Sequence, residues 1–518
     1  MSVRTTPSRS LLLFKIGAAA IGMMLIMLLL LAFPNGEAAA DPDYQDYEVP
    51  LEASDSDVAN EAYLGSSVDV SGDTVVVGAP GKLGQATGVV YVYVRPDTGW
   101  TTGVTATETA TLTLPVAETA GNENFGTSVS ISGDTIVVGA ASEDLSNGAA
   151  YVFVKPEGGW TSTTSYVGKL THTATNFAEL FGESVAVSGD TIVVGAPAAG
   201  GGSGRAYVFE RPGSGWATAT ASIVLTNTNE GLSDDFGVSV DVNGDTIVVG
   251  AKWVDINGQV DQGAAYVFQR SGADWASDGT PDAELTAGDE GDEFGASVAL
   301  REDGRAIVVG APSAERPDLT GANPSNPPDQ GAAYVFVLDD DSWSVAGDIA
   351  SDVLSSGTAG KPNDFYGQSV AISGDTVVVG APRFRTVPSE GAEDRSTGSA
   401  FVYVQPDVGP VLDNWESTDS PLIQLAEINV RGENDRFGEA VAAFGGYIVT
   451  GVPYYDLPAA DSVLDQGLAY LFQNGYCSAK SGLWHSPDTW INGTDVPSID
   501  ADVCVSSYHT VTMDVAPA

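Results

Sequence analysis

A short segment recurs seven times along this chain, and this repetition constrains the fold more than any other feature of the sequence. The clearest copy, FGTSVSISGDTIVVGAAS, begins at Phe125. The other copies begin at Tyr63, Phe181, Phe236, Phe294, Tyr366 and Phe437. A regular period indicates stacked copies of one supersecondary unit, so we expect a repeat architecture. The period averages about 62 residues, longer than that of WD40 or kelch repeats.

Each copy has the pattern of a β-hairpin followed by a third strand. The first strand ends at a turn such as Gly189-Asp190, where glycine supplies the positive φ of a two-residue hairpin. The second strand, TIVVGA at 191–196, is apolar without alternation, as expected for a strand covered on both faces. Aromatic and β-branched residues mark the third strand. Tryptophans follow it in the first five units, and we expect them to pack between neighbouring units rather than to stack on a ligand. They are Trp100, Trp160, Trp216, Trp275 and Trp343.

A short fourth strand is expected near a leucine that precedes the next copy. These leucines are Leu114, Leu170, Leu225, Leu285, Leu354 and Leu425. The seventh copy has no such successor, whereas Val49–Glu52 is a spare fourth strand with no copy before it. We therefore predict an all-β, seven-bladed β-propeller over residues 49–475 that is closed by this N-terminal strand, because a ring leaves no long free edges.

Phe-Gly at the start of a copy and Gly-Ala-Pro at its end resemble the FG-GAP repeat of the integrin α-subunit propeller. The closer resemblance is to the bacterial secreted subtype of this repeat, and it covers about residues 49–472. It implies an extracellular binding or adhesion module. Integrin-type repeats often hold calcium between the first two strands, but here that connection is only Ser-Gly-Asp-Thr. It is too short to surround a cation that takes six to eight oxygen ligands, so those calcium sites are not expected.

The chain is strongly acidic, with 21 Lys and Arg against 69 Asp and Glu and a formal net charge of −48. Such a charge repels nucleic acid and anionic lipid, so neither is expected as a partner. It favours solubility or the binding of cations.

The N-terminal forty residues have the features of a secretory signal. An apolar run over 16–33 follows basic residues, and Ala38–Ala40 offers a cleavage site of small residues. We expect residues 1–40 to be a signal peptide cleaved after Ala40, and 41–48 to be a linker. If the segment stays uncleaved, the run is long enough to anchor the chain in a membrane with its basic end inside.

The best candidate metal site is the loop DINGQVD, in which Asp255, Asn257 and Asp261 are candidate calcium ligands. The Asp-x-Asn-Gly spacing is typical of calcium loops, but the terminal bidentate glutamate of an EF-hand is missing. The alternative is an ordinary surface turn. Calcium is the only cofactor that the sequence suggests.

Acidic residues also recur just before the Phe-Gly positions. They are Asp234, Asp235, Asp289, Glu290, Asp292, Glu293, Asp364 and Asp435. Either they surround one rim as a surface for cations or basic ligands, or they only terminate loops. The loops at 313–330 and 383–397 depart most from the repeat, and partner specificity is expected there if anywhere.

Catalytic motifs are not recognisable in this sequence, and no catalytic residue is assigned. The only histidines are His172, His485 and His509, and they occupy no common place in the repeat. No nucleophile elbow, zinc-binding helix motif or phosphate-binding loop occurs. Paired carboxylates for glycoside hydrolysis remain open as an alternative.

The last residues, 476–518, are expected to form a short β-rich tail. A disulfide between Cys477 and Cys504 is predicted for a chain sent to an oxidising compartment. The Gly-x-Trp and Thr-Trp pairs at 482–490 resemble the opening of secreted bacterial β-solenoid domains, including G8-like segments. Because a solenoid needs about three stacked turns, either the chain is a fragment or the tail packs on the propeller.

These observations favour a secreted, non-enzymatic module that contacts extracellular proteins or glycans through its propeller loops. The alternative is a polysaccharide-acting enzyme, or the non-catalytic module of a longer cell-surface enzyme.

Overall fold

The computed structural model describes most of the repeat region of the chain. The described residues are 48–54, 62–81, 88–118, 123–227, 231, 233–270, 275, 279–315, 330–338, 343, 352–356, 361–386, 395–405, 423–426, 435–455, 466–473, 476–477, 482–483, 503–504 and 511–512. The expected signal peptide lies outside them, as does the expected linker except for Glu48, which already belongs to a strand. Within the described residues no helix is both long and apolar enough to cross a bilayer.

Seven sheets repeat one antiparallel pattern, and each is a blade. In blades 1–6 the four strands follow chain order from the inside outward, whereas in blade 7 the N-terminal strand takes the fourth place. Blade 1 contains β2 (Ser67–Ser71), β3 (Thr74–Ala79), β4 (Val89–Val94) and β6 (Ala110–Leu112). Blade 2 contains β7 (Phe125–Ser132), β8 (Thr135–Ala140), β9 (Ala149–Val154) and β10 (Gly168–Thr171). Blade 3 contains β11 (Ser184–Ser188), β12 (Thr191–Ala196), β13 (Arg205–Glu210) and β15 (Ile223–Leu225). Blade 4 contains β16 (Ser239–Asn243), β17 (Thr246–Ala251), β18 (Ala264–Gln269) and β19 (Ala283–Leu285).

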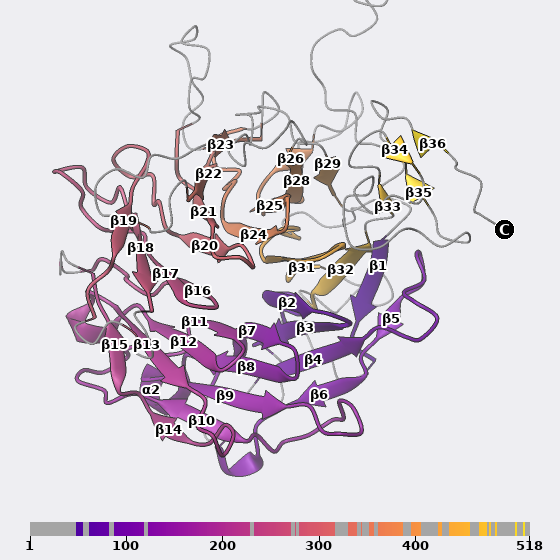
Figure 1. The fold of residues 1–518 in the computed structure, drawn as a ribbon, viewed down its shortest axis with the longest axis horizontal. Coiled ribbons are helices and arrows are strands. Elements are labelled where there is room, and N and C mark those ends of the chain that lie inside the picture. The colour runs from indigo at the N-terminus through magenta and orange to yellow at the C-terminus, as the bar shows by residue number, and fades with distance from the viewer. Residues whose placement is uncertain are drawn as a thin grey trace, which may run out of the picture. The chain divides into compact units, whose positions relative to one another are not determined.

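The remaining three blades follow the same order. Blade 5 contains β20 (Ser297–Leu300), β21 (Ala306–Ala311), β22 (Ala332–Val337) and β23 (Asp352–Leu354). Blade 6 contains β24 (Ser369–Ser373), β25 (Thr376–Ala381), β28 (Ser399–Val404) and β29 (Ile423–Leu425). Blade 7 contains β30 (Val441–Phe444), β31 (Tyr447–Val452), β32 (Leu468–Gln473) and β1 (Glu48–Glu52). Each first strand contacts the first strands of both neighbouring blades, and β30 contacts β2, so the first strands form a closed inner ring (Figure 1).

The N-terminal strand closes this ring, as the sequence predicts. Strand β1 pairs antiparallel with β32, and Leu51 lies opposite Ala469. The sequence repeat is therefore offset from the blade by one strand. The fourth strand of blade 1 lies near Leu114 as expected, but it ends at Leu112, which lies opposite Val90, and Leu114 lies beyond it. Both leucines are buried on the same face, so alternation alone does not decide which one enters the ladder.

Glycines hold the blades close together at every joint. A Cβ atom on the Gly-Ala-Pro glycine of one blade would overlap the carbonyl oxygen of the Phe-Gly glycine of the next, as for Gly195 and Gly237. That same carbonyl accepts a hydrogen bond from a serine hydroxyl of the preceding blade in six joints. The six serines, at 2.8–2.9 Å, are Ser67, Ser128, Ser184, Ser239, Ser297 and Ser369. The joint between blades 7 and 1 has Ala440 in this position, and there the glycines in close contact are Gly451 and Gly65.

Apolar cores lie between successive blades rather than within them. One core joins Val193 and Val208 of blade 3 to Val249 of blade 4 and includes Trp275, which is 2% exposed. Trp160, Trp216 and Trp343 occupy the equivalent places in three other cores, which confirms that these tryptophans pack between units. Each such core makes two neighbouring blades depend on each other for burial.

The loop between the third and fourth strands covers the outer edge of the preceding blade. In blade 1 it forms β5 (Ala106–Thr107), which pairs in parallel with β1, and in blade 3 it forms β14 (Ala219–Thr220), which pairs with β10. Gly279 in blade 4 accepts a hydrogen bond from Thr226 behind β15. These contacts protect strand edges that would otherwise template aggregation.

Two aspartates stand out on the inner strands. Asp69 of β2 and Asp241 of β16 occupy a position that alanine or serine takes in the other blades. The Asp69 carboxylate accepts hydrogen bonds at 2.7 Å from the amides of Val70 and of Ile131 in blade 2. The Asp241 carboxylate likewise accepts hydrogen bonds from the amides of Val242 in its own blade and of Leu300 in blade 5. The carboxylates thus satisfy the unpaired amides of the innermost strands.

Removal from bulk water outweighs these bonds and raises the pKa of Asp69 to about 6 and that of Asp241 to about 7. Asp69 and Glu302 add to the pKa of Asp241 by charge repulsion. The native state therefore binds these protons more tightly than the unfolded chain does, so this contribution to stability is present at low pH and is lost as pH rises.

The glycine joints lead to a first prediction. Gly195→Ala places a methyl group against the backbone of blade 4 and should lower the free energy of unfolding by about 3 kcal/mol or more. Gly189→Ala, in the hairpin of the same blade, meets no atom within 4 Å and bears only the strain of its φ of 56°. It should cost about 1 kcal/mol. Chemical denaturation of both variants makes the comparison, and equal losses would contradict the joint's role.

The inner aspartates lead to a second prediction. Between about pH 4 and pH 7 the native state holds more protons on Asp69 and Asp241 than the unfolded state, so the melting temperature should fall across this window. Asp241→Asn should make that fall smaller, whereas Asp97→Asn at an exposed site should leave it unchanged. Thermal melts at closely spaced pH values test this. An unchanged slope in the Asp241 variant would show that the carboxyl does not titrate there.

Candidate functional site

The propeller has two faces of different character because its strands alternate in direction. The hairpin turns and the loops between third and fourth strands emerge at one face, which we call the turn face. The loops between second and third strands, and the connectors from each fourth strand to the next first strand, emerge at the other, which we call the loop face. The turn face repeats closely, and turn aspartates there pair with basic residues, such as Asp190 with Arg211 at 3.4 Å. On the loop face, the loops between second and third strands differ in length, as 197–204 in blade 3 and 252–263 in blade 4 do.

Seven equivalent residues on the loop face adopt the left-handed conformation without being glycine. Each precedes the Phe-Gly, Tyr-Gly or Leu-Gly pair at the start of a first strand, with φ between 51° and 59°. They are Tyr63, Asn124, Leu180, Asp235, Glu293, Phe365 and Arg436. Because non-glycine residues rarely adopt this conformation, the surrounding structure must impose it. One backbone geometry thus presents seven different side chains.

The acidic residues two positions before the aromatic residue are buried rather than displayed around a rim. Their exposed fractions lie between 0% and 5%. They are Glu123, Glu179, Asp234, Asp292, Asp364 and Asp435. Asp234 accepts hydrogen bonds from the amide of Gly231 at 2.8 Å and the side chain of Asn227 at 2.9 Å. Asp292 likewise accepts the amide of Asp289 at 2.7 Å. These carboxylates therefore stabilise the connectors. Because they are buried, they do not form a rim that binds cations or basic ligands, which was one of the two alternatives from the sequence.

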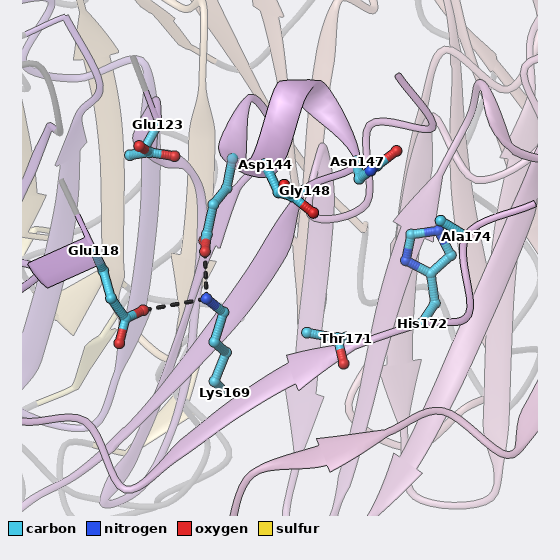
Figure 2. Close-up of a pocket in the computed structure, with 10 residues that line it drawn as sticks. Glu118, Glu123, Asp144, Asn147, Gly148, Lys169, Thr171, His172 and Ala174 are labelled. Carbon is cyan, nitrogen blue, oxygen red and sulfur yellow. Dashed lines mark hydrogen bonds and ion pairs between the residues drawn. The ribbon is translucent and has the colours of Figure 1, made fainter. Parts of the chain in front are cut away.

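A pocket of about 420 Å³ opens on the loop face of blade 2 (Figure 2). Three segments surround it: the turn η2 (Val116–Glu118), the helical turn α2 (Glu143–Ser146), and the end of β10 with the residues after it. The Lys169 ammonium lies between the carboxylates of Glu118, at 3.2 Å, and Glu143. The Tyr151 hydroxyl lies 2.8 Å from Glu118 and 2.5 Å from Glu143. This group is not among the residues expected from the sequence. Lys169 could have pointed to it, because basic residues are few in this acidic chain and a lysine on a strand needs acidic partners.

The charges of this group support one another. Burial raises the pKa of Glu118, but hydrogen bonds from Tyr166, Tyr151 and Lys169 outweigh it and hold the pKa below its usual value. Burial lowers the pKa of Lys169, but the hydrogen bonds and charges of Glu143 and Glu118 raise it overall. Burial and the bond to Glu118 raise the pKa of Tyr166 to about 12. At neutral pH the pair Glu118 and Lys169 is therefore ionised, and Tyr166 keeps its proton.

His172, beside the same pocket, has a structural partner. Its side chain is 2% exposed, stacks on Phe181 at 4.9 Å between ring centroids, and hydrogen-bonds Glu179. Glu179 also accepts the amides of Thr175, at 2.8 Å, and Asn176, at 2.7 Å. The pair anchors the connector from blade 2 to blade 3. His485 and His509 lie outside the described residues.

The candidate calcium ligands lie in the loop after β17. The Asp261 amide donates to Asp255 Oδ1 at 3.1 Å, and both Asn257 and Asp261 have a φ of 53°. Within the described part of the chain, no three His, Cys, Asp or Glu side chains are grouped so that they could hold a metal. The calcium site at Asp255, Asn257 and Asp261 stays a prediction.

The expected specificity loops are described only at their ends. Of 313–330 the structure describes 313–315 and 330, and of 383–397 it describes 383–386 and 395–397. Within the latter, β26 (Arg385–Thr386) pairs with β27 (Arg395–Ser396). The remaining residues of both loops lie outside the described chain.

The tail is described as two pairs of short parallel strands. Strand β33 (Tyr476–Cys477) pairs with β35 (Val503–Cys504), and β34 (Gly482–Leu483) pairs with β36 (Val511–Thr512). Cys477 is the register partner of Cys504. Neighbouring strands lie about 4.8 Å apart, within the Cα separations of about 4.4–6.8 Å found for disulfides. The backbone register thus suits the disulfide, which stays a prediction.

Comparison with known proteins agrees with this architecture. No curated protein matches the chain. The model of the FG-GAP repeat matches six segments, which together cover more than half of it. They are residues 51–93, 107–153, 164–209, 222–268, 280–336 and 357–403. The first five matched segments each join a fourth strand to the next three strands, as the one-strand offset requires, and the sixth, 357–403, covers the first three strands of blade 6. The chain therefore belongs to the FG-GAP repeat family, with a seventh blade built from 441–473 and the N-terminal strand.

Proposed function

We propose that this protein is a secreted, non-enzymatic binding or adhesion module whose loop face contacts extracellular proteins or glycans. The observation that carries the proposal is the ring of seven left-handed residues. Their backbone is the same in every blade, whereas their side chains range from Tyr63 and Phe365 to Glu293 and Arg436. A rigid scaffold that presents varied loop residues is the usual basis of recognition.

The pKa shifts at the blade 2 pocket favour binding over catalysis. A general acid or base works best when its pKa lies near the working pH. In this pocket the pKa values of Glu118 and Lys169 move away from neutrality, in opposite directions. Tyr166, with a pKa of about 12, is no better suited to transfer a proton.

Secretion is proposed from the sequence of residues 1–40 and from the two cysteines. The apolar run and the alanines after it fit a signal peptide cleaved after Ala40. Opposed cysteines in β33 and β35 suit an oxidising compartment.

A second candidate is a propeller module attached to a β-solenoid domain of a longer cell-surface enzyme. The parallel pairing of β33 with β35 and of β34 with β36 favours it, because both pairs join segments separated by a similar length of chain. One turn of a parallel solenoid produces this arrangement. The propeller would then bind the polymer on which the other domain acts.

The binding proposal predicts that the chain retains specific ligands on an array of extracellular proteins and glycans. Retention should fall at least about tenfold when Trp253→Ala and Arg383→Ala are combined on the loop face, because anchors of these types dominate interfaces. The matched turn-face pair, Val104→Ala with Arg211→Ala, should retain the same ligands. Equal loss in both double variants, or no ligand on the array, would contradict binding through the loop face.

A further inference from the structure

We propose that the loop face of blade 2 docks a segment of a partner protein that presents basic side chains flanked by apolar ones. This inference rests on the proposed binding function and names the place and the chemistry of one partner. It starts from the exposed apolar side chains of the described residues. The three most exposed large ones are Val116 at 90%, Phe177 at 85% and Leu145 at 79%.

These three side chains come from the three segments that surround the 420 Å³ pocket. Val116 belongs to η2 with Glu118, Leu145 follows Asp144 in α2, and Phe177 lies in the connector after His172 and Ala174. Figure 2 shows Glu118, Asp144 and His172 on these three segments. Single exposed apolar residues are common on proteins. Here, however, the three most exposed ones all lie on segments that line one pocket, and such a concentration of exposed apolar side chains is typical of a recognition surface.

Hydrogen bonds join the three segments into one surface. The connector binds α2 through Leu180 N to Ser146 O at 2.9 Å and Phe181 N to Asn147 O at 3.0 Å. Tyr151 joins η2 to α2 because its hydroxyl contacts both Glu118 and Glu143. Leu145 is held outward by a φ of 60° between two further left-handed residues, Asp144 and Ser146. The apolar side chains therefore sit on a preorganised support.

The pocket between them is negatively charged. Its lining includes the carboxylates of Glu118, Glu123, Glu143 and Asp144 but one ammonium, that of Lys169. Lys169 already binds Glu118 and Glu143, so it does not offset the charge of Asp144. Asp144 is exposed at the rim. A guanidinium or ammonium group complements this pocket in charge and in hydrogen bonding.

A protein segment can match both the acidic pocket and the exposed apolar side chains beside it. Nucleic acid and anionic lipid are repelled by the pocket and by the net charge of −48. A neutral glycan supplies no cation for the carboxylates. A peptide with arginines between leucine or phenylalanine residues supplies a cation for the pocket and apolar groups for Val116, Leu145 and Phe177. The long-range field of the acidic chain also accelerates the encounter with such a partner.

The test titrates the full chain with the acetylated, amidated peptide GLRFRLG by isothermal calorimetry. Control peptides replace both arginines with citrulline, or all three apolar residues with serine. Leu145→Ser, Phe177→Ser and Asp144→Lys should each weaken binding about tenfold, since each removes a contact or inverts a charge at the surface. The matched turn-face changes Val104→Ser and Asp97→Lys alter residues of the same types and should bind as the unchanged chain does.

Each outcome decides the proposal. Binding that requires the arginines and the apolar residues of the peptide, and that the three loop-face variants weaken, supports it. Binding that turn-face and loop-face variants weaken equally reveals a non-specific attraction to the acidic chain and overturns it. If GLRFRLG does not bind while other ligands on the array still do, this inference fails and the broader binding function stands. If nothing binds, both fail.

Discussion

The close approach of glycine backbones around the inner ring is the constraint on which the rest of the propeller depends. In blades 1 and 3–7 the amide of the first-strand glycine donates to the Gly-Ala-Pro carbonyl of its own blade, as from Gly182 to Gly195 at 2.9 Å. Across the joint, Gly195 leaves no room for a side chain against Gly237. The two glycines of the repeat signature therefore set the spacing between blades. That spacing in turn determines how tightly the apolar cores between blades can pack.

The same joint explains the strained residues beside it. The aromatic residue of each Phe-Gly pair is buried between blades, as Phe181 is at 0% exposure, while the glycine must reach the next joint. The preceding residue absorbs the resulting turn and takes a positive φ whatever its side chain. The strain of order 1–3 kcal/mol per residue is tolerated because burial and hydrogen bonding on both sides over-determine the conformation. Variation at Leu180 or Arg436 then changes the surface without changing the fold.

Sequence reasoning recovers what the repeat encodes and fails where one blade departs from the others. Strand pattern, blade number and closure through Leu51 follow from seven aligned copies. The choice of Leu112 over Leu114 depends on the ladder register, which alternation cannot specify for two leucines on one face. The burial of the connector carboxylates could not be predicted from their charge. An aspartate such as Asp234 is written the same way in the sequence whether the fold buries or exposes it. The group at Glu118, Glu143 and Lys169 comes from three separate segments, and only the fold brings them together.

Acidic side chains have several physical roles in this protein, and the environment of each carboxylate determines its role. Turn-face aspartates such as Asp190 lie in solvent beside basic residues, where exposed pairs contribute little. Connector carboxylates such as Asp234 are buried and bond the amides that shape the loops. Around the blade 2 pocket, Glu118 and Glu143 hold Lys169, whereas Asp144 stays at the exposed rim. The net charge of −48 therefore does not describe the local charge that a ligand contacts on the loop face. Recognition depends on the few carboxylates that the fold leaves outside its own hydrogen bonds, and blade 2 places one of these next to exposed apolar side chains.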